Sequence, residues 1–157
     1  MSKLTVEQIR QRAEADLNTF AVLVNPTRVY GDIHHEVFDW LQSDIRMAPE
    51  AAGFIPKPNQ LVLLPRAHQK SHAIAIWVAW YITRTPWTTV LYVSATEGLA
   101  LQQVYAIKQI LESKVYRKYW PEMVHEDEAK REKWSASEVK VDHPKRAEMN
   151  VRDPTRS

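Results

Sequence analysis

The sequence predicts an α/β domain in which helices flank a parallel sheet, and three observations support this prediction. An apolar run over 60–64 leads through a short loop into a strongly helical pattern over 71–84. A second, nearly continuous apolar run over 88–94 has the composition of a parallel strand that is buried on both faces. The whole unit has about 35 residues, the size of a strand–helix–strand crossover. We therefore expect residues 60–94 to form the centre of the domain.

Helices are predicted on both sides of this unit. Residues 3–24 place apolar side chains at helical spacing, and Pro26 ends the pattern because proline disfavours helical geometry in the residue before it. Further amphipathic helices are expected over 33–45 and 97–113. Beyond Tyr119 the chain is rich in charge, so we expect surface loops with one short strand over 137–142.

Composition narrows the class of protein. A chain of 157 residues is long enough for one domain with a real core. It has no cysteine, which excludes disulfides and cysteine-based metal sites, and its net charge of +2 gives no global attraction for nucleic acid. The longest apolar run, 73–82, is too short to span a bilayer, so no membrane partner is expected.

The junction between the first predicted strand and its helix has the layout of a phosphate-binding loop. In the pattern G-x-x-x-x-G-K-[ST], backbone N–H groups, a helix N-terminus and a lysine converge on phosphates. Lys70 and Ser71 match the pattern, whereas Leu64 and Gln69 occupy its glycine positions. Lys70 would contact the β and γ phosphates, the Ser71 hydroxyl would bind Mg²⁺, and Arg66 would add a second cation. The alternative is an ordinary strand–loop–helix with a surface lysine and serine.

Residues 62–72, Val-Leu-Leu-Pro-Arg-Ala-His-Gln-Lys-Ser-His, resemble the divergent Walker A segment of tailed-bacteriophage terminase large subunits. A Pro-Arg-x-His-x-Lys-Ser core is common in that family, although most members carry glycine where this chain has Gln69. Other segments resemble the family in the same order along the chain, and they are 25–30, 34–41, 91–100, 133–138 and 152–155.

The resemblance implies a P-loop NTPase fold of the ASCE type, a three-layer α/β sheet with flanking helices, truncated before the Walker B strand. It implies an N-terminal helical region over 1–58 and a partial ATPase core over 59–157, without the nuclease domain. ATP and Mg²⁺ are the implied cofactors, with Lys70 and Arg66 as catalytic residues and Ser71 as the metal ligand. The implied cofactor-binding residues are Arg28, Tyr30, Pro65, Arg66, Ala67, His68, Gln69, Lys70, Ser71 and His72.

The segment before the loop carries a second expectation from the family. There it is implicated in adenine binding, so Tyr30 would stack on the base while Arg28 or Asn25 contacts it. The alternative is a turn with a packed tyrosine.

Three further patterns have competing interpretations. Ser94 or Thr96 would either contact DNA or cap the following helix. Adjacent residues such as His34 and His35 face different directions on a helix, so a zinc site is not expected there. A set of basic and aromatic residues has two interpretations. It would either bind DNA phosphates, or its basic residues would form the solvent-exposed face of a helix while its aromatic residues pack in the core. Its members are Lys108, Lys114, Tyr116, Arg117, Lys118, Tyr119 and Trp120.

A complete hydrolytic site is not expected. ATP hydrolysis needs an aspartate on a strand to hold Mg²⁺ and a glutamate to activate water, and no apolar strand followed by such a pair occurs in the sequence. The resemblance thus implies a fragment of the DNA-packaging motor, inactive alone, with ATPase and endonuclease activity belonging to the full-length protein.

The family also implies double-stranded DNA, the portal protein and the small terminase subunit as partners, a homo-oligomeric ring, and the cytoplasm of the infected bacterial host. Two other functions remain open: a non-catalytic interaction module of P-loop fold, and a helicase-like P-loop ATPase.

Overall fold

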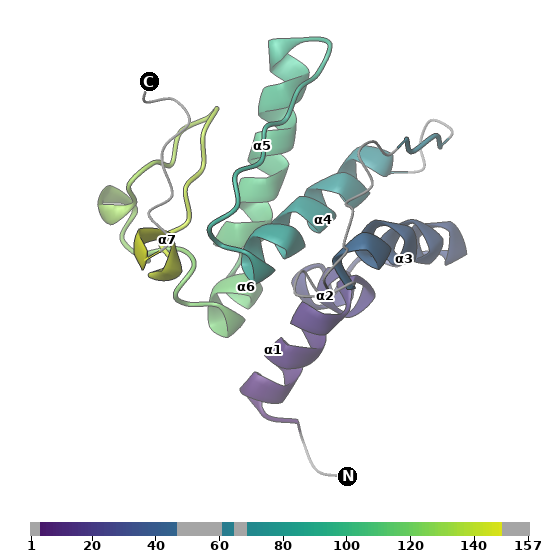
Figure 1. The fold of residues 1–157 in the computed structure, drawn as a ribbon, viewed down its shortest axis with the longest axis horizontal. Coiled ribbons are helices and arrows are strands. Elements are labelled where there is room, and N and C mark those ends of the chain that lie inside the picture. Colours follow the sequence, from purple (N-terminus) through teal and green to yellow (C-terminus); the bar gives the residue numbers. More distant parts are fainter. Residues whose placement is uncertain (1–3, 47–60, 65–68, 149–157) are drawn as a thin grey trace, which may run out of the picture.

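The computed structural model describes residues 4–46, 61–64 and 69–148, which form helices joined by turns and irregular segments (Figure 1). α4 lies at the centre and packs against α1, α2 and α3 on one side and α5 on the other. The elements are α1 (Val6–Ala15), α2 (Leu17–Val24), α3 (Asp32–Arg46), α4 (Lys70–Arg84), α5 (Glu97–Glu112), α6 (Lys114–Tyr119), the 3₁₀ turn η1 (Glu128–Lys130) and α7 (Lys145–Glu148).

The predicted α/β fold is wrong for these residues. Neither 61–64 nor 88–94 forms a strand, and the β-type pairing found in the described ranges is a single bridge between Trp134 and Val139. The three-layer P-loop sheet truncated before a Walker B strand is therefore not what the chain forms here. An apolar run becomes a strand only when its backbone groups pair with a neighbour, and composition predicts no such neighbour.

Three predicted helices are confirmed, because α3, α4 and α5 differ from the predicted ranges by a single residue at most at either end. α6 was not predicted as a separate helix. The short strand expected over 137–142 is reduced to the bridge at Val139. None of the described helices combines the length and the apolar character needed to cross a membrane. The proposed boundary between 1–58 and 59–157 falls outside the described residues.

The single helix predicted over 3–24 is two helices that meet at Asp16. In an unbroken helix the Leu17 N–H would donate to the Ala13 carbonyl. Instead, Leu17 N donates to Gln42 Oε1 at 2.9 Å, and the Ala13 carbonyl accepts from Trp80 Nε1 at 2.9 Å. Asp16 has an extended backbone and caps α2 by accepting from the Thr19 N–H. Long-range partners thus replace the helical hydrogen bond, which local periodicity cannot reveal.

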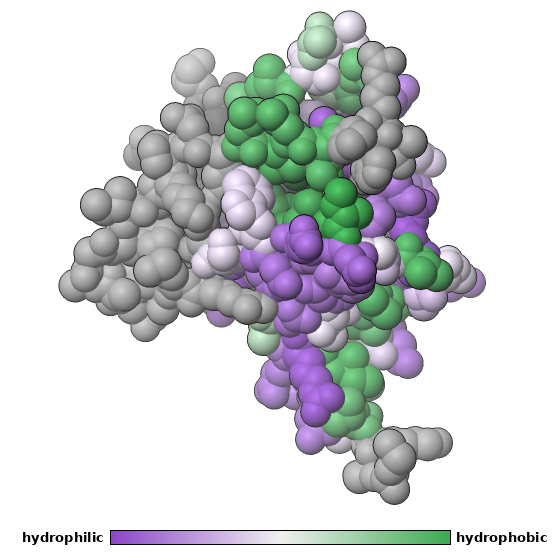
Figure 2. Space-filling model, turned by 90° about the vertical axis from the view of Figure 1, so that its right-hand side faces the viewer, coloured by the Kyte–Doolittle hydropathy of each residue, from purple (hydrophilic) through white to green (hydrophobic). Residues whose placement is uncertain are grey.

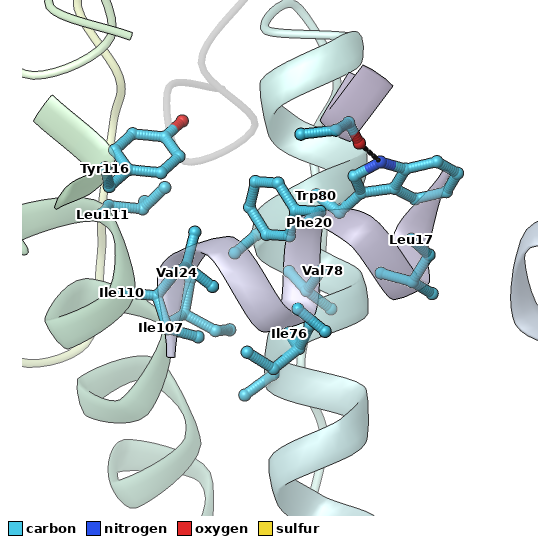
Figure 3. Packing of buried hydrophobic residues seen from close by; sticks show 14 of the residues in the cluster. Leu17, Phe20, Val24, Ile76, Val78, Trp80, Ile107, Ile110, Leu111 and Tyr116 are labelled. Carbon is cyan, nitrogen blue, oxygen red and sulfur yellow. Dashed lines mark hydrogen bonds between the residues drawn. The ribbon is translucent and has the colours of Figure 1, made fainter. Parts of the chain in front are cut away.

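The core lies where α2, α4, α5 and α6 meet (Figure 3). Phe20, Tyr116 and Trp120 form an aromatic cluster, with ring centroids 5.4 Å apart for Phe20–Trp120 and 5.0 Å for Tyr116–Trp120. Trp80 is fully buried, and its indole N–H is satisfied by the Ala13 carbonyl, as an enclosed polar group requires.

Apolar residues also gather on the outside of the molecule. Figure 2 shows a hydrophobic area above a hydrophilic band on one face. The most exposed large apolar side chains of the described residues lie outside the helices, and they include Val29, Leu61, Leu63, Leu91 and Val93.

Candidate phosphate-binding site

The structure describes six of the ten predicted cofactor-binding residues. Pro65, Arg66, Ala67 and His68 lie outside the described ranges. The others come from two segments, 28–30 before α3 and 69–72 at the start of α4, which are brought together because α3 packs against α4.

Two contacts hold the segments together. The Arg28 guanidinium donates a hydrogen bond to the Gln69 side-chain carbonyl. The Tyr30 hydroxyl lies 3.2 Å from His72 Nε2, and the two rings are stacked with an interplanar angle of 13° and centroids 6.3 Å apart. The residues before α3 therefore form one surface with the first turn of α4.

Gln69 has a left-handed backbone, with φ 51° and ψ 28°. It occupies the position that the phosphate-loop pattern reserves for glycine, which adopts this conformation without strain. A residue with a β-carbon takes it at a cost of roughly 1–2 kcal/mol. The left-handed backbone at this position explains why the pattern has glycine there. Gln69 adopts the same backbone conformation.

The start of α4 has the character of an anion-binding surface. The side chain of Gln69 makes no capping hydrogen bond, so it leaves the N–H groups of the first turn to other acceptors. Lys70 and Ser71 are exposed, and the first turn contains no acidic residue. The partial positive charge of the helix N-terminus adds to the charges of Lys70 and Arg28.

His72 and Tyr30 are uncharged at neutral pH. Burial, with smaller contributions from the positive charge of Arg28 and from His34, lowers the pKa of His72 to about 4. Burial raises the pKa of Tyr30, and this is partly opposed by Asn25 and Arg28. Among the described residues of this surface, the cationic side chains are therefore Lys70 and Arg28.

Tyr30 is packed on several sides. Its ring contacts Phe38 edge-on with centroids 5.3 Å apart, in addition to its stack on His72, and only 8% of the residue is exposed. The ring is therefore packed within the fold, as in the alternative in which Tyr30 is a packed residue of a turn. In this arrangement Tyr30 positions His72 and offers no open face to a base.

His34 is a neighbour of the site that the sequence interpretation missed. Its Nδ1 accepts from the Gly31 N–H at 3.1 Å, and its ring lies edge-on to Tyr30 with centroids 5.9 Å apart. The available signal was its position as the third residue of α3, from which a side chain can reach back to the residue before the helix.

The other predicted positions have structural roles. Thr96 caps α5 by accepting from the Leu99 N–H at 3.3 Å. Tyr116 and Trp120 are fully buried, so the aromatic part of the basic and aromatic set belongs to the core. Lys108 lies over the Trp134 ring and donates to the Ser135 carbonyl.

Metal binding has less support in the described residues than phosphate binding. Within them, no group of three or more histidine or acidic side chains is arranged to hold a metal ion. Mg²⁺ at the start of α4 would have Ser71 as its protein ligand from the first turn of that helix, with its other oxygens coming from phosphate and water. The arrangement fits a phosphate-bearing ligand and supplies no carboxylate from this turn.

Comparison with known proteins gives the chain no family. No protein-family model, curated protein or solved structure matches it.

Proposed function

We propose that this chain is part of the large subunit of a tailed-bacteriophage terminase, the ATP-driven motor that packages phage DNA. Within that protein it would bind the phosphates of ATP at the start of α4. The support is the ordered sequence resemblance and the convergence of the expected site residues, and the proposal involves no β-sheet. Double-stranded DNA, portal protein and small terminase subunit would be its partners in the host cytoplasm.

One observation carries the phosphate-binding part of the proposal. Arg28 bonds to Gln69 and Tyr30 stacks on His72, across 41 and 42 positions of sequence. These contacts bring the Arg28 guanidinium beside the N-terminus of α4, whose first residue is Lys70. Cationic side chains and the backbone N–H groups of a helix N-terminus are recurring elements of phosphate recognition in proteins.

Each residue has a distinct part in binding. Lys70 would neutralise the terminal phosphates as a point charge, while the forked guanidinium of Arg28 suits two phosphate oxygens. Ser71 would offer its hydroxyl to the Mg²⁺ that accompanies the nucleotide. We expect weak nucleotide binding and negligible hydrolysis, because hydrolysis also needs carboxylates that hold Mg²⁺ and activate water.

A titration with a fluorescent ATP analogue tests the proposal. Replacing Lys70 by alanine should weaken binding about tenfold or more, because a hydrogen bond to a charged group contributes about 1.5–3 kcal/mol. Lys114→Ala is the matched control, because Lys114 is the exposed first residue of α6, as Lys70 is of α4. Inorganic pyrophosphate should displace the analogue if phosphates supply the recognition.

Equal affinity of the wild type and Lys70→Ala would contradict the proposal. It would favour the interaction module, which has one observation on its side: Leu91 and Val93 are largely exposed on a segment without a partner in the described chain. Phosphate release that depends on Lys70 would contradict the expected lack of hydrolysis and would leave nucleotide binding intact.

A further inference from the structure

Gln69 has a left-handed backbone, which no other non-glycine residue in the described ranges shares. This conformation is strained for a residue with a β-carbon, and strained residues occur most often at functional sites. The Gln69 carbonyl closes the first turn of α4 by accepting from the Ala73 N–H at 2.9 Å. A glycine would close the same turn without strain, so any advantage of glutamine must come from its side chain.

The side chain of Gln69 contacts Arg28, a residue from a distant part of the sequence. Its carbonyl oxygen accepts a hydrogen bond from Nη1 of the Arg28 guanidinium and takes no part in capping α4. Arg28 is exposed, and an exposed arginine samples many rotamers. An acceptor that orders the arginine in advance lowers the entropy that ligand binding must later remove.

Arg28 keeps most of its binding capacity while it contacts Gln69. A guanidinium has several N–H donors, and Gln69 accepts from Nη1. Within the described ranges, no residue accepts a hydrogen bond from Nε or Nη2 of Arg28. These two nitrogens form a planar edge that can bind two phosphate oxygens at once. Gln69 therefore holds the guanidinium at the start of α4 and leaves this edge open.

The amide of Gln69 is also uncharged. A carboxylate in its place would bond more strongly to the guanidinium, but it would cancel part of the positive charge that attracts phosphate. The first turn of α4 likewise contains no acidic residue. A neutral acceptor therefore fixes the position of Arg28 and preserves the positive charge of the surface.

We propose that Gln69 is a positioning residue for the phosphate site, whose side chain holds the Arg28 guanidinium at the start of α4 so that it is in place when phosphate binds. The inference rests on the proposed phosphate binding, and it assigns Gln69 a role that glycine could not have. The strain in its backbone is the cost of placing this amide at the first turn.

Glycine and alanine at position 69 separate the effect of the backbone from that of the side chain. Both Gln69→Gly and Gln69→Ala remove the contact with Arg28, but Gln69→Ala keeps a β-carbon in the left-handed conformation. Both variants should bind the fluorescent ATP analogue about two- to tenfold more weakly than the wild type, because Arg28 must then be ordered on binding. Gln69→Gly should nevertheless unfold at a higher urea concentration than Gln69→Ala.

Two outcomes of this comparison would contradict the proposal. Wild-type affinity in Gln69→Gly would show that the side chain adds nothing to binding. Equal urea midpoints for the glycine and alanine variants would show that position 69 is not held in the left-handed conformation.

Gln69→Glu tests why the acceptor is neutral. This variant keeps an acceptor for Arg28 but places a negative charge beside the site, so its affinity for the analogue should fall further than that of Gln69→Ala. Gln109→Glu, at an exposed position near the end of α5, makes the same change in net charge and should bind as the wild type does. Equal affinities of the two glutamate variants would overturn the proposal.

A double-mutant cycle distinguishes positioning from a purely structural role. If Gln69 acts through Arg28, then Gln69→Ala should cause no further loss of affinity in an Arg28→Ala background. The Arg28→Ala variant alone should bind at least as weakly as Gln69→Ala alone. Additive losses would overturn the proposal, because a structural role of Gln69 would weaken binding whether or not Arg28 is present.

Lys70→Ala in the same titration separates a failure of this inference from a failure of phosphate binding itself. Weaker binding by Lys70→Ala together with unchanged binding by Gln69→Ala would overturn the positioning role and leave the proposed function in place. Unchanged binding by Lys70→Ala would overturn both.

Discussion

Leu111 and Leu91 are the same residue type, but one lies in a buried region and the other in an exposed region. Leu111 lies in α5 and is fully buried, whereas Leu91 lies in the preceding 88–94 segment and is 85% exposed. A helix satisfies its backbone groups within itself, so its apolar side chains need only a neighbouring surface. A strand needs a partner for its backbone before its side chains can be covered. The helical region therefore satisfies its backbone groups and covers core side chains such as Leu111. In the 88–94 segment, Leu91 and Val93 stay exposed.

Leucine-to-alanine substitutions in the two regions should give the largest difference. Leu111→Ala removes packed atoms from the core and should lower the free energy of unfolding by about 2–5 kcal/mol. Leu91→Ala, at a side chain that is 85% exposed, should change it by no more than about 0.5 kcal/mol. Urea unfolding followed by circular dichroism measures both. Comparable losses in the two variants would show that the exposed apolar segments are covered in solution.

The junction of α1 and α2 shows that even the helical region depends on tertiary partners where its backbone is interrupted. Gln42→Leu keeps the volume similar but leaves the Leu17 N–H without its acceptor and removes the Gln42 amide as one of the donors to Asp16. The expected loss of unfolding free energy is about 1–3 kcal/mol, the cost of an unsatisfied buried group. Gln102→Leu, at an exposed position of α5, is the control in the same urea assay. Equal midpoints for the two variants would mean that water replaces Gln42.

The smallest expected effect is the pH dependence contributed by His72, where α4 meets the residues before α3. Its folded-state pKa of about 4 lies below the usual value of 6.5, so the unfolded chain binds the proton more readily. Stability from this group should be constant above pH 6.5 and fall between pH 6.5 and about 4. Because His72 is only partly buried, we expect a loss of about 1 kcal/mol or less at pH 5.

His72→Gln removes this titration and keeps a polar side chain in place. Unfolding free energies at pH 7 and pH 5 should therefore differ more in the wild type than in the variant. Identical differences in the two proteins would mean that the imidazole is accessible to protons in the folded state.

The candidate site divides in the same way between local and long-range information. Lys70 and Ser71 at the start of α4 follow from a local pattern, because the apolar run, the loop and the helix are consecutive in sequence. The association of Arg28 and Tyr30 with this helix was implied by the family resemblance alone. Their contacts with Gln69 and His72 depend on the packing of α3 against α4, which no local pattern contains.

The sequence by itself determined where α3, α4 and α5 begin and end, since helical hydrogen bonds join residues four apart and the apolar spacing records which face is buried. Only the tertiary structure decided that α1 and α2 separate at Asp16 and that 61–64 and 88–94 do not join in a sheet. Both outcomes depend on which distant group a backbone N–H or C=O meets. The composition of a segment indicates its tendency to form a β-strand. Whether another segment lies beside it to accept and donate backbone hydrogen bonds depends on the whole fold.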